Sequence, residues 1–162
     1  GNQPCLHISW LFNDAGRPSL TQKWVRAILN EFYGTEGIHG YGYGQDEDQG
    51  QLGAWYVIAS MGLFDVKGLT DEHPSFSLGT PLFDKITIRL NEQYYPGKEF
   101  VITTKGEAAA HPYVEQFVLN GKPLDTVRLP FSEIAKGGNL EVVMSDSPTD
   151  RYGNKKGEEE AQ

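Results

Sequence analysis

Three consecutive carboxylates, Asp46-Glu47-Asp48, are the residues of this sequence best suited to chemistry. Like charges raise one another's pKa, so such a triplet is costly to hold unless a cation or a reaction needs it. In a chemical interpretation, one carboxylate activates a water as the general base of glycoside hydrolysis, and a neighbour fixes the geometry or binds a cation. In a structural interpretation, Asp46 or Asp48 caps a helix and the acids interact with its N-terminal dipole. The local sequence favours the cap, but a helix start is rigid enough for both roles.

The stretch before the triplet alternates glycine with larger residues, at Gly37, His39, Gly40, Tyr41, Gly42, Tyr43 and Gly44. Glycine lets the backbone come close to a ligand. Tyr41 and Tyr43 are therefore candidates for sugar contact, with packing about equally plausible. His7, near the start of the chain, is by itself more typical of a hydrogen-bonded histidine at a helix start than of a ligand.

Helical spacing of apolar residues predicts three helices in the first part of the chain. The first covers Pro4 to Phe12 and closes with the turn at residues 13–16. The second runs from Thr21 to Phe32, capped by Ser19 or Thr21 and ended by Gly34, with an apolar set of Trp24, Val25, Ile28, Leu29 and Phe32 at helical spacing. The third runs from about Gly50 to Met61, and Gly62 is its stop signal.

Period-two alternation after Leu63 predicts strands at residues 85–90, 100–103, 113–119 and 140–144. Asn120-Gly121 predicts a hairpin turn, because both turn positions need a positive φ that these residues tolerate. The fold class is therefore α+β, with helices in residues 1–77 and a small antiparallel β-sandwich-like region in residues 78–148. Residues 149–162 are predicted to be a disordered tail, because they contain few apolar side chains.

Composition excludes several classes of function. Fourteen Lys and Arg residues against 22 Asp and Glu give a net charge of -8, so nucleic acid is not expected as a partner. No apolar stretch is long enough to span a bilayer, so membrane insertion is not expected. Cys5 is the single cysteine and is expected to be a small buried hydrophobe.

Six motifs occur in order along the chain and together resemble the C-terminal end of the glycoside hydrolase family 92 α-mannosidases. They are Gly1-Asn2-Gln3-Pro4 with His7-Ile8, the run from Asp46 to Val57, Gly62-Leu63-Phe64, Leu78-Gly79-Thr80-Pro81-Leu82-Phe83, Leu119-Asn120-Gly121-Lys122 and Gly137-Gly138-Asn139-Leu140. Each motif alone is weak, but six in register are specific. The resemblance implies an inverting, calcium-dependent exo-α-mannosidase, in which residues 1–77 are the last helices of an (α/α)6 barrel.

The resemblance also implies roles for individual residues. Asp48 matches the family's catalytic base and Asp46 assists it, while the general acid, a glutamate, lies outside this chain. Glu47, His7, Tyr41 and Tyr43 are the expected contacts to the sugar. Asn2 and Gln3 are the expected neighbours of the calcium ion, although Gln3 stands where the family usually has Glu, which lowers the charge of the site. The family often has two adjacent histidines where this chain has Leu6-His7, so Leu6 stands at the position of the first histidine.

The expected partners are mannose-containing glycans, including N-glycans with α-1,2-linked mannose, and upstream domains of the same polypeptide. The family implies a periplasmic or secreted location. The main alternative is a carbohydrate-binding or interdomain scaffold module without catalysis of its own, since the strands resemble an accessory sandwich. A third interpretation is a different (α/α)6 glycosidase or a phosphorylase.

Overall fold

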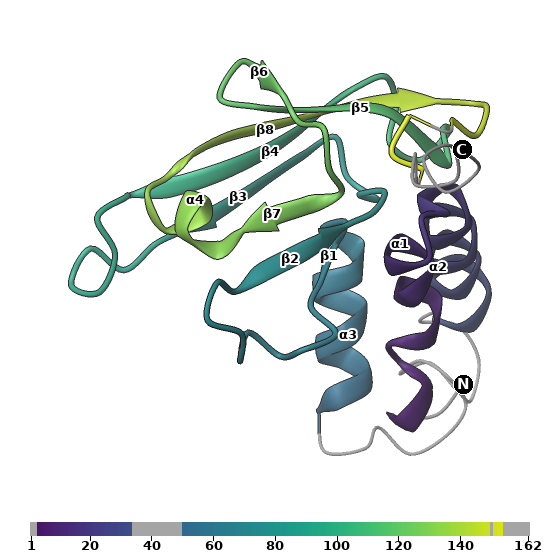
Figure 1. The fold of residues 1–162 in the computed structure, drawn as a ribbon, viewed down its shortest axis with the longest axis horizontal. Coiled ribbons are helices and arrows are strands. Elements are labelled where there is room, and N and C mark those ends of the chain that lie inside the picture. Colours follow the sequence, from purple (N-terminus) through teal and green to yellow (C-terminus); the bar gives the residue numbers. More distant parts are fainter. Residues whose placement is uncertain (1–2, 34–49, 150, 154–162) are drawn as a thin grey trace, which may run out of the picture.

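The computed structural model describes residues 3–33, 50–149 and 151–153. The helices of the first sixty residues gather at one side, and the two sheets, with one short later helix beside them, lie at the other (Figure 1). The helical elements are η1 (Gln3–Cys5), η2 (Ile8–Trp10), α1 (Leu11–Asp14), α2 (Pro18–Phe32), α3 (Gln51–Ser60) and α4 (Phe131–Ala135). The strands are β1 (Leu63–Phe64), β2 (Ser75–Leu78), β3 (Lys85–Arg89), β4 (Glu99–Lys105), β5 (Tyr113–Leu119), β6 (Lys122–Pro123), β7 (Arg128–Pro130) and β8 (Gly138–Ser145). The prediction of a mixed helix and sheet fold is confirmed.

The helix predicted over residues 4–12 forms as two 3-10 turns, η1 and η2, followed by the short α1. The turn after it is confirmed, because Gly16 has a φ of 68° and α1 ends at Asp14. Cys5 is exposed, so the prediction that it is buried is wrong.

Helix α2 begins at Pro18, three residues before the predicted start, and neither Ser19 nor Thr21 caps it. Proline suits the first position of a helix, since its φ is already helical and its missing N–H would have no partner there. Within the predicted apolar set, Val25 and Leu29 are buried, whereas Trp24 and Phe32 are each 46% exposed. Gly34, the predicted end, lies outside the described residues.

Helix α3 matches its prediction closely. It ends at Ser60, and Gly62 follows in the left-handed region with a φ of 75°. A Cβ at Gly62 would lie 2.9 Å from the backbone nitrogen of Pro81, so glycine is required by both conformation and space.

Two sheets carry the strands. The smaller has the order β1-β2-β7 and the larger β3-β4-β8-β5-β6. Among the described residues the strands pair in antiparallel orientation except β4 with β8, so the prediction of a wholly antiparallel region is wrong at one place. Strand β8 lies between β4 and β5. The order of the strands in the sequence alone would place β4 and β5 side by side. The hairpin between β5 and β6 is confirmed, with φ values of 49° at Asn120 and 78° at Gly121.

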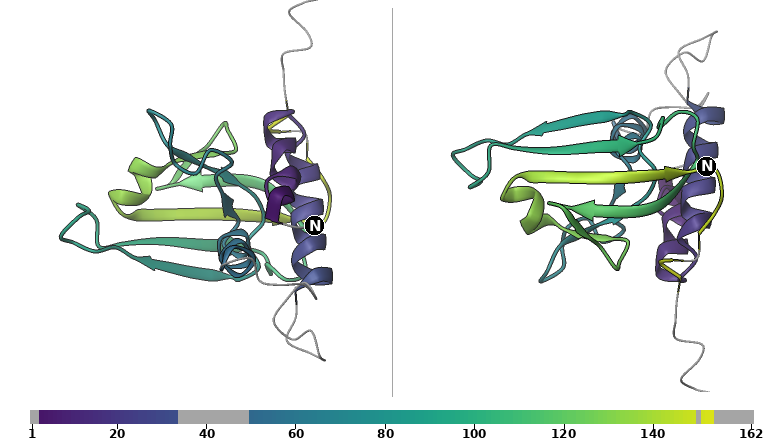
Figure 2. Two further views of the ribbon diagram at one scale, coloured as in Figure 1. Left: turned by 90° about the horizontal axis from the view of Figure 1, so that it is seen from below. Right: turned by 90° about the horizontal axis from the view of Figure 1, so that it is seen from above.

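A first core lies between the sheets and a second among the helices. The first is built on alternating residues of the strands, such as Phe100, Ile102, Leu140 and Val142. The second is built on Trp10, Val25, Leu29, Trp55 and Ala59. Figure 2 shows α2 running along one end of the sheets. The predicted boundary at residues 77/78 falls inside β2, which pairs with both β1 and β7.

Tyr152 lies in the segment predicted to be disordered, yet it is 8% exposed. Its ring lies 5.5 Å from that of Phe117, and its hydroxyl accepts a hydrogen bond of 2.8 Å from the Phe117 amide. Burial raises the pKa of this phenol. At residues 151–153 the prediction of disorder is therefore wrong. Among the described residues, the helices are all too short and too polar to cross a bilayer.

Candidate functional site

Six of the eight predicted site residues lie outside the described part of the chain: Asn2, Tyr41, Tyr43, Asp46, Glu47 and Asp48. The structure does describe residues that flank them. Gln3 begins η1, Tyr33 precedes the segment 34–49, and Gly50 follows it as the N-cap of α3. The site can therefore be examined through the elements that hold its ends.

An aromatic cluster joins the two ends of the segment 34–49. The ring of Tyr33 stacks on Trp55, with 5.7 Å between centroids, and lies 5.0 Å from Tyr56. Trp55 is buried and packs in the core among the helices. Because Tyr33 follows α2 and the other two rings belong to α3, the cluster fixes where the segment leaves one helix and enters the next.

The same cluster holds the N-terminal motif. The indole Nε1 of Trp55 donates a hydrogen bond of 2.9 Å to the carbonyl of Leu6. His7 follows directly, half-buried, and its carbonyl accepts a hydrogen bond from the Trp10 amide. His7 is the N-cap of η2, so its predicted placement at a helix start is confirmed, and its side chain makes no cap hydrogen bond there. One tryptophan therefore links the backbone beside His7 to the helix that follows Asp48.

A small cavity of about 70 Å³ lies beside this cluster, lined by Cys5, Leu6, Ser9, Ile28, Phe32, Tyr33, Leu52 and Trp55. Its lining is mostly apolar, and its volume is smaller than a monosaccharide needs. The cavity therefore belongs to the packing that holds the two motifs together.

Helix α2 is attached to the β region by buried polar side chains. The Arg26 guanidinium donates to the carbonyls of Ala108 at 2.8 Å and of Pro81 at 2.9 Å. Burial lowers the pKa of Arg26. One turn earlier, the Gln22 side-chain oxygen accepts a hydrogen bond of 3.1 Å from the Val114 amide. These contacts fix the helix that leads into the segment 34–49.

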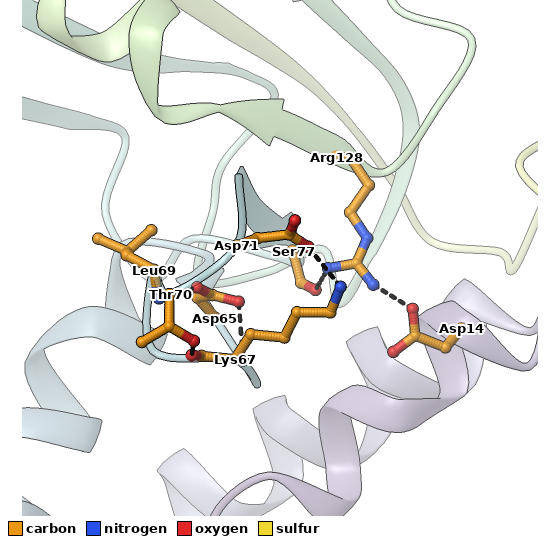
Figure 3. A network of polar contacts seen from close by, with 8 residues as sticks. All are labelled: Asp14, Asp65, Lys67, Leu69, Thr70, Asp71, Ser77 and Arg128. Atoms are coloured by element: carbon orange, nitrogen blue, oxygen red, sulfur yellow. Dashed lines mark hydrogen bonds and ion pairs between the residues drawn. The ribbon is translucent and has the colours of Figure 1, made fainter. Parts of the chain in front are cut away.

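A separate polar network surrounds Arg128 on β7 (Figure 3). Its guanidinium donates to the Ser77 hydroxyl at 2.8 Å and forms an ion pair with Asp14 at the end of α1. Nearby, Lys67 and Asp71 form an exposed ion pair, which raises the pKa of Lys67 and lowers that of Asp71. These charges are paired, so they are typical of a surface that holds two elements together.

The family that the sequence resembles is calcium-dependent, so the described residues were compared with what that ion requires. A calcium ion takes six to eight oxygen ligands, among which carboxylates are common. No group of three or more His, Cys, Asp or Glu side chains lies together among residues 3–33, 50–149 and 151–153. The described residues therefore do not make up a calcium site by themselves.

A family model described as the catalytic domain of glycosyl hydrolase family 92 matches residues 1–146. The chain belongs to glycosyl hydrolase family 92.

Solved structures of family 92 enzymes share this fold. A GH92 α-mannosidase from Bacteroides thetaiotaomicron is 30% identical, with a TM-score of 0.81 over 94% of this chain and 19% of its own. A GH92 inverting mannosidase from Bacteroides thetaiotaomicron VPI-5482 is 34% identical, with a TM-score of 0.80 over 95% of this chain and 20% of its own. Among curated proteins, an uncharacterised secreted glycosidase from Arthroderma benhamiae is 25% identical over 89% of this chain and 18% of its own length. The chain thus spans about a fifth of the length of these relatives.

The sequence analysis missed Gln22, Arg26 and Arg128 as residues that fix the arrangement of the family 92 fold. Gln22 and Arg26 lie one turn apart and next to Val25 and Leu29, so they share the buried face of α2. That spacing was a usable signal, but polar side chains on a helix are usually assigned to its solvent face. No local sequence pattern indicated the role of Arg128, because its partners lie 51 and 114 residues away in sequence.

Proposed function

We propose that this chain forms the C-terminal part of an inverting, calcium-dependent exo-α-mannosidase and supplies the catalytic base. The link made by Trp55 carries the proposal. It joins Leu6, which is next to His7 of the N-terminal motif, to α3, which starts at Gln51 shortly after Asp46-Glu47-Asp48. Tyr33, at the other end of the acidic segment, stacks on the same tryptophan. The two motifs that the sequence analysis assigns to one site are therefore attached to one rigid cluster.

In the proposed reaction, the Asp48 carboxylate takes a proton from a water while that water attacks the anomeric carbon. Asp46 holds the base and the water in place. A general acid from another part of the polypeptide gives its proton to the leaving oxygen on the opposite face of the sugar. In inverting enzymes the two carboxyl groups lie roughly 6.5–9.5 Å apart to leave room for the water.

The remaining residues bind and orient the sugar. His7, Tyr41, Tyr43 and Glu47 are proposed to contact its hydroxyls. Asn2 and Gln3 would offer oxygens to a calcium ion, which when bound supplies a hard cation for two hydroxyls of the mannose ring. The proposed substrates are glycans that end in α-1,2-linked mannose, such as N-glycans, and the proposed location is periplasmic or secreted, consistent with the secreted relative.

The helices are proposed to be the last part of an (α/α)6 barrel completed by upstream domains of the same polypeptide. Exposed apolar side chains on the helical elements support this proposal: Ile8, Leu11, Trp24, Phe32 and Val57. Exposed apolar groups that gather on helices are typical of surfaces that pack against another element.

The test uses the full-length protein and an Asp48→Asn variant, assayed on α-1,2-mannobiose. A general base contributes roughly 10²- to 10⁴-fold, so the variant should lose at least about 100-fold in kcat. Proton NMR of the product should first show β-mannose, the sign of inversion. A Glu92→Gln variant, which changes an exposed carboxylate on the β3–β4 connection, is the matched control and should keep full activity. Full turnover by Asp48→Asn, or activity that survives a calcium chelator, would refute the mechanism.

A further inference from the structure

A groove of about 770 Å³, which we call the Arg128 groove, lies in the described part of the chain. It lies where α1, β5, the connection from β6 to β7 and residues 151–153 meet. Its charged lining side chains are Asp14, Asp125, Arg128 and Arg151. None of its lining residues belongs to the motifs assigned to catalysis.

The lining offers donors and acceptors in balance. Two carboxylates face two guanidiniums, so the lining carries no net charge. Arg128 and Asp14 form an ion pair across one wall, and Figure 3 shows the Arg128 side chain reaching from β7 to α1. Asp125 and Arg151 are exposed, and within the described residues their side chains make no hydrogen bond or ion pair. They are therefore available to a ligand.

Asn13 provides a further observation at the inner end of the groove. Its side chain is 8% exposed, and its amide nitrogen donates 3.0 Å to the carbonyl of Leu78. Its Oδ1 atom accepts no hydrogen bond within the described residues. A buried acceptor without a partner is costly, and a bound hydroxyl or water is the usual way to satisfy it.

We propose that the Arg128 groove binds a sugar residue of a mannose-containing glycan, through Asp125, Arg151 and the amide of Gln116. A carboxylate only accepts hydrogen bonds and a guanidinium only donates them, while a sugar hydroxyl does both. A neutral polyhydroxylated ligand therefore matches this lining, whereas a phosphate would face two carboxylates. The choice of a mannose-containing glycan rests on the proposed function.

The affinity should be weak. The exposed side chains must be ordered on binding, and the one aromatic residue of the lining, Tyr152, is buried against Phe117 and offers little ring surface for stacking. We expect a dissociation constant on the order of 1 mM. Such a site would hold a glycan near the protein rather than select it alone.

The test uses the full-length protein with Asp48→Asn, so that the glycan is not consumed, and a high-mannose oligosaccharide as the probe. Saturation-transfer NMR and calorimetry should report a weak binding event. The double variant Asp125→Asn, Arg151→Gln removes both charges but keeps a polar amide at each position, and it should weaken that event at least tenfold. The control is Arg89→Gln, Glu92→Gln, which removes the same two charges at an exposed place away from the groove and should leave binding unchanged.

Two results would overturn the groove assignment. One is equal oligosaccharide binding by both double variants. The other is protection of Thr126 and Arg151 from hydroxyl-radical footprinting in the absence of sugar, which would mean that the rest of the polypeptide fills the groove. Hydrolysis is assayed separately in the full-length protein with Asp48 intact. Loss of the weak event in the Asp125→Asn, Arg151→Gln variant, together with no mannoside hydrolysis by the protein with Asp48 intact, would support the groove and contradict the proposed function, so the two can fail separately.

Discussion

Arg26 is the residue whose replacement tests most directly how the helical part is held against the β region. Replacement by Met keeps an unbranched apolar stem but removes every donor. The guanidinium bridges the carbonyls of Pro81 and Ala108, which lie on two different connections of the β region. The Arg26→Met variant therefore leaves two carbonyl groups without these partners while most of the packing remains.

The magnitude follows from two opposing effects. Hydrogen bonds to a charged group contribute about 1.5–3 kcal/mol each, and two of the three bonds are short enough to count, so the gross loss is roughly 3–6 kcal/mol. The third, to His111 at 3.5 Å, is too long to add much. Part of this loss is offset, because the variant no longer has to bury a charge. The desolvation of that charge is what lowers the pKa of Arg26. We expect a net loss of about 2–4 kcal/mol in local stability.

Hydrogen–deuterium exchange of the full-length protein measures this loss where it occurs. The amides of Leu82, Ala108 and Val114 are hydrogen-bonded in the native fold and should report the opening of both connections. At tenfold per 1.4 kcal/mol, their exchange should accelerate by roughly 30- to 700-fold. Arg17→Met, the same change at an exposed position before α2, should alter these amides little. Acceleration below about fivefold in Arg26→Met would refute the reasoning.

Other changes test the core and its turns. Tyr152→Phe removes the acceptor of the buried Phe117 amide and should cost about 1–3 kcal/mol, measured as faster exchange at that amide. Because the pKa of Tyr152 is raised, the contribution of its neutral phenol to stability is complete below about pH 10. That contribution is lost as pH rises through the folded-state pKa. Above about pH 10 the apparent Tm of the unmodified protein should therefore fall more steeply than that of Tyr152→Phe. Gly97→Ala places a Cβ 2.3 Å from the Lys136 backbone and should cost at least about 3 kcal/mol in a thermal unfolding assay, because backbone must move. Gly121→Ala has open space but a φ of 78° and should cost only about 1 kcal/mol in the same assay.

Local sequence signals predicted the elements that depend on local interactions. The Asn120-Gly121 turn and the end of α3 at Gly62 follow from the backbone preferences of single residues, and both are confirmed. The strand order was not predictable in the same way. Strand β8 pairs with β4 in parallel and with β5 in antiparallel orientation, after the chain has passed through β6, β7 and α4. Alternation shows which residues face a core but not which strand lies beside which.

The distribution of buried and exposed residues on α2 bears on function. Trp24 and Phe32 belong to the apolar set predicted for this helix, yet they are exposed, while Gln22 and Arg26 are buried. An apolar residue on the outer face of a helix is expected where another element of the same protein packs, as the proposed barrel requires. The apolar set predicted for α2 therefore contains residues from both its buried face and its exposed face.

Helix α3 connects the candidate site to the β region. Trp55 and Ala59 belong to the core among the helices, while Ile58 and Met61 pack against the core between the sheets. A change in either core therefore reaches the helix that begins directly after the acidic segment. On the other side of that segment, α2 is held by Arg26 and Gln22 to the connections of the same β region. Both helices that hold the segment 34–49 are thus anchored on the sheets, and we infer that the β region positions the proposed catalytic base rather than acting as an independent appendage.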